Sequence, residues 1–229
     1  MSWLKIVLVN TTHPGNIGSV ARAMKTMGFS ELRLVKPRRF PDKAAYDLAT
    51  HAHDILDQSQ QFETLQSAIS DCEFVCTTSA RVRKHPLQVY SPSQLRASLQ
   101  HNPRTTALVF GNEQSGLDNN QINLGQKQII IPTSREYSVL NIAQACQIIL
   151  YELQFVQQRQ QVPTPTNSDV TQDEIEVLFS HVESALAALE ICNNQAGINM
   201  IRQIINRSGL SKRELGFLNG LFCSIQKKN

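Results

Sequence analysis

The chain of 229 residues carries a net charge of +3, with 41% hydrophobic and 18% charged residues. These values are ordinary for a soluble globular protein, and the length allows one large domain with a small appendage. No apolar run approaches the roughly 20 residues that a membrane span requires, and no signal-peptide pattern opens the sequence. We therefore expect a cytoplasmic protein. The charge is too small to indicate a nucleic-acid partner by itself, so local clusters of basic residues matter more.

Strands and helices are predicted to alternate through residues 1–156. Short apolar runs rich in β-branched residues predict buried strands at 5–9, 32–35, 74–77, 106–110 and 128–131. Helical patterns follow at 16–27, where Gly28 ends the helix, and at 44–49, 62–69, 93–99, 119–124 and from about 141. The alternation predicts an α/β domain with a mostly parallel sheet and helices on both faces.

Apolar patterning stops at residues 157–169, where Gln, Pro, Thr and Asn predict a flexible linker. Residues 170–229 then show three amphipathic helical patterns, at 175–189, 198–205 and 215–225. Roughly sixty residues make a marginal core, so this helical appendage needs a partner surface on the large domain or on a second chain. We expect a homodimer, because the first of these helices carries an apolar stripe of Ile175, Leu178, Val182, Leu186 and Leu189.

The cysteines are odd in number and scattered, with no CxxC pair: Cys72, Cys76, Cys146, Cys192 and Cys223. Zinc sites and disulfide frameworks show regular spacing, so buried or incidental thiols are the better interpretation. The sequence also lacks a GxGxxG after the first strand, a phosphate-binding P-loop and a GxSxG elbow. Hydride transfer, P-loop chemistry and serine-hydrolase chemistry therefore have no support.

Three polar loops each join a predicted strand to a helix. In the first, Gly15 and Gly18 would let a phosphate approach the backbone, and Arg22 can fork onto phosphate oxygens. The second, FGNEQSGL, places Glu113 directly after a buried strand, and the third leads to Asn141 at a helix start. Taken singly, each loop is more often a turn or a cap. Glu113 pairing with a nearby Arg, and Asn141 capping its helix, therefore stay open.

Taken together and in order, NIGSVARAMKTMGF, LVFGNEQSGL and IPTSREYSVLNIAQA resemble the three motifs of the SPOUT (SpoU/TrmD) RNA ribose methyltransferases. The helical C-terminus makes the chain most similar to the TrmJ branch. The resemblance implies a deep C-terminal trefoil knot that binds S-adenosylmethionine, and a homodimer whose two chains complete the site. Pattern alone predicts a doubly wound sheet, because knots are rare.

The resemblance also implies which residues act. It assigns the cofactor pocket to Thr78, Ser79, Ala80, Gly111, Ile131, Ser138, Val139 and Leu140. It places around the reacting ribose Asn16, Arg22, Glu113, Ser138 and Asn141. Relatives often carry Ser where this chain has Val139, which puts a side-chain role there in doubt. No metal is required, since the sulfonium methyl is already electrophilic.

The implied reaction is 2′-O-methylation of tRNA at the pyrimidine of anticodon-loop nucleotide 32. Another tRNA nucleotide, ribosomal RNA, or a catalytically silent RNA-binding protein are the alternatives. Two basic loops are candidates for RNA phosphate contact, one with Arg38 and Arg39 and one with Arg81 and Lys84. Solvated surface charge is the alternative for both loops.

Overall fold

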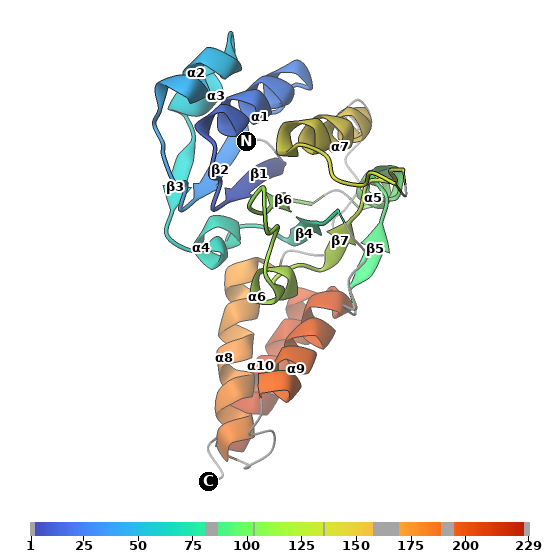
Figure 1. Ribbon diagram of the computed structural model, residues 1–229. Helices are drawn as coiled ribbons and strands as arrows, with labels where there is room; N and C mark the ends of the chain where they lie inside the picture. Colours follow the sequence, from blue (N-terminus) through green and yellow to red (C-terminus); the bar gives the residue numbers. More distant parts are fainter. Residues whose placement is uncertain are drawn as a thin grey trace.

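One all-parallel sheet organises the large domain. The computed structural model describes residues 3–80, 87–102, 104–134, 136–157, 170–188 and 195–226. Within them seven strands lie in the order β3-β2-β1-β6-β4-β7-β5 (Figure 1). Their bounds are β1 (Leu4–Val9), β2 (Glu31–Val35), β3 (Gln60–Phe62), β4 (Phe74–Thr78), β5 (Gln88–Tyr90), β6 (Thr106–Phe110) and β7 (Lys127–Ile129).

Helices cover both faces of this sheet, as predicted (Figure 1). One layer holds α1 (Pro14–Thr26), α2 (Lys43–Ala49), α3 (His53–Asp57), α5 (Pro92–His101) and α7 (Ile142–Gln157). The other holds α4 (Leu65–Ile69) and α6 (Asn119–Asn123). Side chains of β1 alternate between two cores, with Ile6 in the first and Val7 in the second. The strand is therefore buried on both faces, which explains its continuous apolar run.

The local predictions fail at short elements. The three-residue strands β3 and β5, and the short helix α3, were not predicted. The helix predicted at 62–69 is shorter, because Thr64 caps it by accepting a hydrogen bond from the Ser67 N–H, and Phe62 belongs to β3. Gly28 has φ 78°, consistent with its predicted place after the end of α1.

The predicted helical appendage consists of α8 (Gln172–Ala188), α9 (Gln195–Ser208) and α10 (Lys212–Gln226). Its apolar stripe needs no second chain, because Leu178 and Val182 are buried against Ile205 and Leu215 of the same tail. The apolar stripe is therefore a wrong reason for expecting a homodimer, and the homodimer that the family resemblance implies stays a prediction. Leu189 lies outside the described residues.

The tail docks on the large domain beside α4 and α6 (Figure 1). The backbone N–H groups of Gln172 and Asp173 donate to the carbonyls of Cys72 and Ser70, each at 3.0 Å. On α9, Asn206 Nδ2 donates to the Asn123 carbonyl at 2.8 Å. These contacts join the first turn of α8 to the segment before β4, and α9 to α6. The partner surface is therefore on the large domain, one of the two predicted possibilities.

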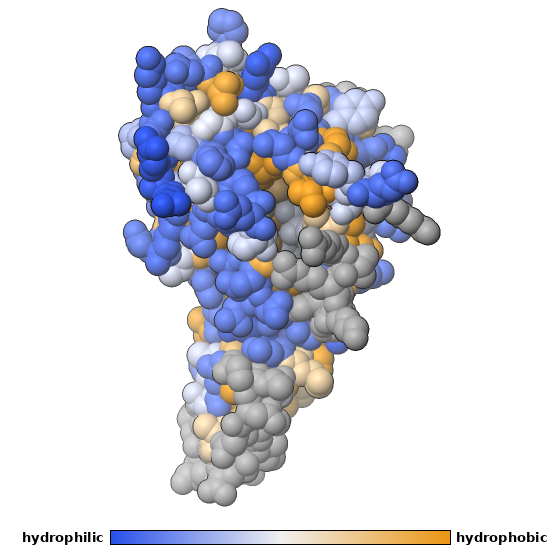
Figure 2. Space-filling view, viewed as in Figure 1, coloured by the Kyte–Doolittle hydropathy of each residue, from blue (hydrophilic) through white to orange (hydrophobic). Residues whose placement is uncertain are grey.

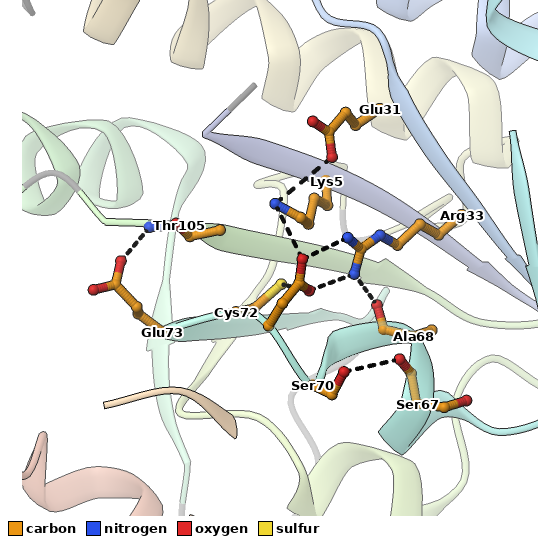
Figure 3. Close-up of polar contacts among 10 residues, drawn as sticks. Lys5, Glu31, Arg33, Ser67, Ala68, Ser70, Cys72, Glu73 and Thr105 are labelled. Atoms are coloured by element: carbon orange, nitrogen blue, oxygen red, sulfur yellow. Dashed lines mark hydrogen bonds and ion pairs between the residues drawn. The ribbon is translucent and has the colours of Figure 1, made fainter. Parts of the chain in front are cut away.

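Charged side chains connect the amino ends of the central strands (Figure 3). Asp71 lies 3.7 Å from Lys5 Nζ and accepts two hydrogen bonds from Arg33, at 2.6 and 2.8 Å. Lys5 also lies 3.6 Å from Glu31. The hydrogen bonds from Arg33, opposed by partial burial, lower the pKa of Asp71 to about 2. The network ties β1 and β2 to the start of β4.

The predicted buried thiols are found at Cys72, Cys76 and Cys146, which are free and buried. Burial raises the pKa of Cys72 and of Cys76 to about 12, so both remain protonated at neutral pH. Cys223 is free and half-buried, and Cys192 lies outside the described residues. The accessible thiolate that redox chemistry needs is therefore not provided by the three buried cysteines.

Candidate active site

A cavity of about 730 Å³ opens at the carboxyl ends of β4, β6 and β7. Its walls come from the loops that follow these three strands and from the start of α1. Hydrophobic residues come to the surface of the large domain around α7 and the loop before it (Figure 2). Ligands of open α/β sheets bind at this edge, where loops leave the strands.

Most of the predicted site residues line this cavity. The eight cofactor candidates do so: Thr78, Ser79, Ala80, Gly111, Ile131, Ser138, Val139 and Leu140. Asn16, Glu113 and Asn141 also line it. Segments far apart in sequence thus converge on one space. Arg22 is the exception, because it is exposed on α1 and does not line the cavity.

Glu113 holds the start of α1. His13 is the N-cap of this helix but its side chain makes no capping hydrogen bond, and Pro14 follows. The Glu113 carboxylate instead accepts from the backbone N–H of Thr12 at 2.9 Å and of His13 at 3.1 Å. It also accepts from Asn16 Nδ2 at 2.9 Å. A carboxylate satisfies free N–H groups at a helix start and is favoured there by the helix dipole.

Partial burial raises the pKa of Glu113, but the hydrogen bonds from Asn16, Thr12 and His13 outweigh it, so the pKa lies below its usual value. The carboxylate is therefore ionised at neutral pH. Within the described chain it has no ion pair with a basic side chain. Pairing with an Arg, the alternative interpretation of Glu113, is therefore not seen among the described residues, which do not include Arg81, Arg83 and Arg135.

Asn16 joins the first loop to the third. Its Oδ1 accepts from Asn141 Nδ2 at 3.0 Å, while its own Nδ2 donates to Glu113. Asn16 is not the cap of α1, because it lies within the helix. Asn141 also accepts from the Ala143 N–H at 2.8 Å, as expected for a cap of α7. The capping interpretation of Asn141 is correct but incomplete, since its amide is shared with the site.

Glycines in these loops serve the protein's own packing. A Cβ on Gly111 would lie 2.3 Å from the carbonyl carbon of Gly116, so this tight loop excludes any larger residue. A Cβ on Gly18 would lie 1.9 Å from the Ala45 carbonyl oxygen of α2. The predicted role of Gly18 in phosphate approach is therefore wrong, because the residue faces a neighbouring helix.

Comparison with known proteins identifies the family of the site. The model of the SpoU rRNA Methylase family matches residues 4–151. This chain belongs to the SpoU methylase family. It is 36% identical to the tRNA (cytidine/uridine/adenosine-2'-O-)-methyltransferase TrmJ of Pseudomonas aeruginosa, over 98% of this chain and 94% of that protein. It is 37% identical to the tRNA (cytidine/uridine-2'-O-)-methyltransferase TrmJ of Klebsiella pneumoniae, over 99% and 97%.

A solved SpoU-type structure extends the likeness to the tail. The crystal structure of TrmJ from Z. mobilis ZM4 superposes with a TM-score of 0.88 at 27% identity, covering 97% of this chain and 98% of that one. The agreement thus includes the helices beyond residue 170. The resemblance to the SPOUT methyltransferases and to the TrmJ branch is confirmed.

The lining residues that were not predicted include His13, Asn112 and Tyr137. Asn112 Nδ2 donates to the Asn10 carbonyl at 2.7 Å and to Thr12 Oγ1 at 2.8 Å, which ties the second loop to the first. Tyr137 is 80% exposed at the cavity although it is aromatic. The signal in the sequence was that Tyr137 is an aromatic residue inside an otherwise polar motif, TSREYS.

One basic loop lies beside the segment that leads into α1, and the other lies outside the described residues. The Arg38 N–H donates to the Thr11 carbonyl at 3.0 Å, which places this loop beside the start of α1. Arg39 pairs with Asp42 at 3.1 Å, whereas the exposed Arg38 side chain has no ion pair in the described chain. Arg81 and Lys84 are not among the described residues.

Within the described ranges, His, Cys, Asp and Glu form no cluster of three that suits a metal ion. Among the helices described there, none has the length and apolar character needed to cross a membrane.

Proposed function

We propose that this protein transfers the methyl group of S-adenosylmethionine to a ribose 2′-hydroxyl of tRNA, at the pyrimidine of anticodon-loop nucleotide 32. The observation that carries the proposal is the cavity, where Asn16, Glu113 and Asn141 are joined by hydrogen bonds across three motifs. The P. aeruginosa and K. pneumoniae relatives, named as tRNA 2'-O-methyltransferases, align over nearly the whole chain and support it.

The cavity fits the proposed cofactor in size and chemistry. Its volume of about 730 Å³ falls within the range of small-molecule sites. Apolar side chains such as Ile129, Ile131 and Leu140 suit an adenine ring, and the Thr78 and Ser138 segments supply polar groups. When bound, the cofactor supplies a methyl group that is already electrophilic. The protein then has to position the ribose and stabilise the charge that develops on its oxygen.

Within this proposal Glu113 positions other groups and does not remove the proton. Its carboxylate accepts three N–H donors, and its lowered pKa makes it a weak base. Asn16 donates one side-chain N–H to Glu113, and Asn141 donates one side-chain N–H to Asn16. The second N–H of each is directed to the ribose or phosphate oxygens of the substrate, and Ser138 lies at the same cavity.

Arg22 acts in the proposal from a second copy of the chain. It is exposed on α1 and does not line its own cavity, so a homodimer would let it reach the partner's ribose. A guanidinium stays protonated near neutral pH and cannot serve as a base, so Arg22 binds phosphate and stabilises the developing alkoxide.

The fold proposed with this function includes the family's trefoil knot, and the position of β7 between β4 and β5 is compatible with it.

Arg22→Ala and Arg22→Lys test the assignment. We expect Arg22→Ala to lower single-turnover methylation of tRNA about 10²- to 10³-fold, with unchanged S-adenosylmethionine affinity by calorimetry. Arg22→Lys should be nearly as inactive, because it keeps the charge but loses the planar fork. Lys25→Gln is the control, since Lys25 is on the same helix and pairs with Asp54 at 2.6 Å. Wild-type rates in Arg22→Ala would contradict the role of Arg22.

Mapping of ribose methylation tests the substrate. RNA from cells with and without the gene should differ at nucleotide 32 of some tRNAs. A difference only at another tRNA nucleotide, or in ribosomal RNA, would contradict the chosen position. RNA binding by the pure protein without any methyl transfer would contradict the catalytic proposal and favour the silent RNA-binding alternative.

A further inference from the structure

The basic side chains of the described chain divide into paired and unpaired groups. Those that pair with a carboxylate are Lys5, Lys25, Arg33, Lys36, Arg39, Arg96, Arg202 and Lys212. Arg22, Arg38, Lys43 and Arg213 have no such ion pair among the described residues, and neither have Arg104, Lys127 and Arg207. These three, the junction cluster, come from the segment before β6, the start of β7 and the docked tail.

Arg104 presents an unused hydrogen-bonding fork. Its guanidinium carbon lies 4.1 Å from the centre of the Phe74 ring, so the group is stacked on an aromatic face. Its Nε is buried and has no hydrogen-bond partner in the described structure. A buried donor without an acceptor is costly, and stacking on a ring leaves the terminal N–H groups of a guanidinium free to donate to the oxygens of a phosphate.

Lys127 begins β7 and is paired with Cys76 of β4, two residues after the Phe74 ring on which Arg104 stacks. Its Nζ is 5.1 Å from the centre of the Tyr90 ring and donates at 2.7 Å to Oε1 of Gln88, which is neutral. Burial lowers the pKa of Lys127, and the positive charges of Arg104 and Arg207 lower it further, against an opposing effect of Cys76. Lys127 is therefore repelled by both arginines, and an anion would relieve that repulsion.

Arg207 is brought to this place by the docking of the tail. Gln203 Nε2 donates to Asn123 Oδ1 at 3.0 Å, and Asn206 donates to the Asn123 carbonyl, four residues before Lys127. The Arg207 side chain is exposed, and its one hydrogen bond in the described chain goes to the Gln203 carbonyl, at 3.3 Å. A docked helix thus adds a cation to an edge that already holds two.

We propose that the junction cluster binds phosphate groups of the RNA backbone, as a second RNA contact away from the methylation site. The inference rests on the proposed function for the identity of the RNA. Arg104 precedes β6 and the cavity follows it, so the five residues of the strand separate the two places by about 17 Å. The bound phosphates therefore belong to a different part of the RNA from the methylated nucleotide.

The test compares two double variants of equal charge. Lys127→Gln with Arg207→Gln removes two cluster cations, while Arg96→Gln with Lys212→Gln removes two cations that are paired with Glu152 and Glu174. Binding of full-length tRNA is measured at several salt concentrations. We expect the cluster variant to bind about tenfold more weakly at low salt, with a salt slope shallower by about two, and the control to change little. The cluster variant should keep wild-type cofactor affinity and its rate at saturating tRNA.

Arg104→Lys gives an independent measurement, since it keeps the charge but loses the fork, and it should weaken tRNA binding severalfold without changing the melting temperature. Equal losses in the cluster and control variants, or unchanged tRNA affinity, would overturn the inference. So would weaker binding of inorganic phosphate with tRNA affinity intact, which indicates a free-anion site. If the wild type binds tRNA but transfers no methyl group, the proposed function fails while this inference stands.

Discussion

The two ends of the parallel sheet use polar residues in different ways. At the amino ends, Lys5, Arg33 and Asp71 form ion pairs that connect strands, beside the docked tail. At the carboxyl ends of β1 and β6, the carboxylate of Glu113 is bound by neutral N–H donors and has no ion pair in the described chain. The difference indicates that charge pairs connect the strands beside the tail, whereas neutral donors hold the carboxylate at the cavity.

Glu113→Gln should give the largest effect and act on function more than on stability. A Gln side chain turns an N–H group toward one of the donors that the carboxylate accepts, so the start of α1 and Asn16 shift. We expect kcat/KM for tRNA methylation to fall about 100-fold and the free energy of unfolding to fall by about 1–2 kcal/mol. Glu136→Gln, at an exposed residue of the third loop, is the control. Activity within twofold of wild type would contradict the positioning role of Glu113.

Gly111→Ala would break the comparison, because a residue of the functional end should here govern stability. The added Cβ would meet backbone atoms of Gly116 and Leu117 at 2.3 Å, and backbone cannot easily move. We expect urea unfolding to show a loss of about 3 kcal/mol. The matched control is Gly220→Ala in α10, where no atom lies within 4 Å of the added group. That change should stabilise by about 0.5–1 kcal/mol; a Gly111→Ala protein as stable as wild type would disprove the steric argument.

Asp71→Asn should lower stability and leave function unchanged, whereas Glu113→Gln should act mainly on function. The pKa of Asp71 is lowered to about 2 from 3.8, so its contribution to stability is present above about pH 4 and is lost as the pH falls toward 2. Because its side chain is 53% exposed, we expect Asp71→Asn to cost only about 1–2 kcal/mol at neutral pH. Unfolding measured from pH 2 to 7 should be less pH-dependent in the variant, with cofactor affinity unchanged. Equal pH dependence in both proteins would rule out this contribution.

Tyr137→Ala should have the smallest effect and should appear only with RNA. This exposed ring at the cavity is suited to stacking with a base, which is worth about 1 kcal/mol or more. We expect KM for tRNA to rise about fivefold, while Tyr137→Phe, which retains the ring, stays near wild type. A loss of S-adenosylmethionine affinity in Tyr137→Ala would instead assign the ring to the cofactor.

Local sequence was sufficient for the central strands and insufficient for the edges. The runs that form β1 and β6 are apolar and buried throughout, so their pattern is visible without knowledge of the fold. In β3 and β5, by contrast, residues such as Gln60 and Gln88 are exposed, and these short strands are extended because a neighbour pairs with them. Pairing of that kind depends on the complete sheet, so a local pattern does not predict it.

The composition of the site followed from the motifs, but its connections did not. Glu113 bonds to Thr12, 101 residues away, because β1 and β6 are neighbours in the sheet and their loops emerge together. Gly18 looked like a phosphate-binding residue until its contact with α2 was known. Arg22 matches a catalytic motif position, yet one chain alone does not bring it to the cavity. Motifs thus predicted the members of the site, and strand order fixed their contacts.

The row from Ala143 through Asn141 and Asn16 to Glu113 has a single direction. A backbone N–H, which can only donate, begins it, and a carboxylate, which can only accept, ends it. Neither amide can rotate by a half-turn without placing two donors or two acceptors face to face. The orientation of both asparagine side-chain amides is therefore fixed before any ligand binds. Protonation of Glu113, or an Asp at either position, would remove one of the two fixed ends or interrupt the order between them.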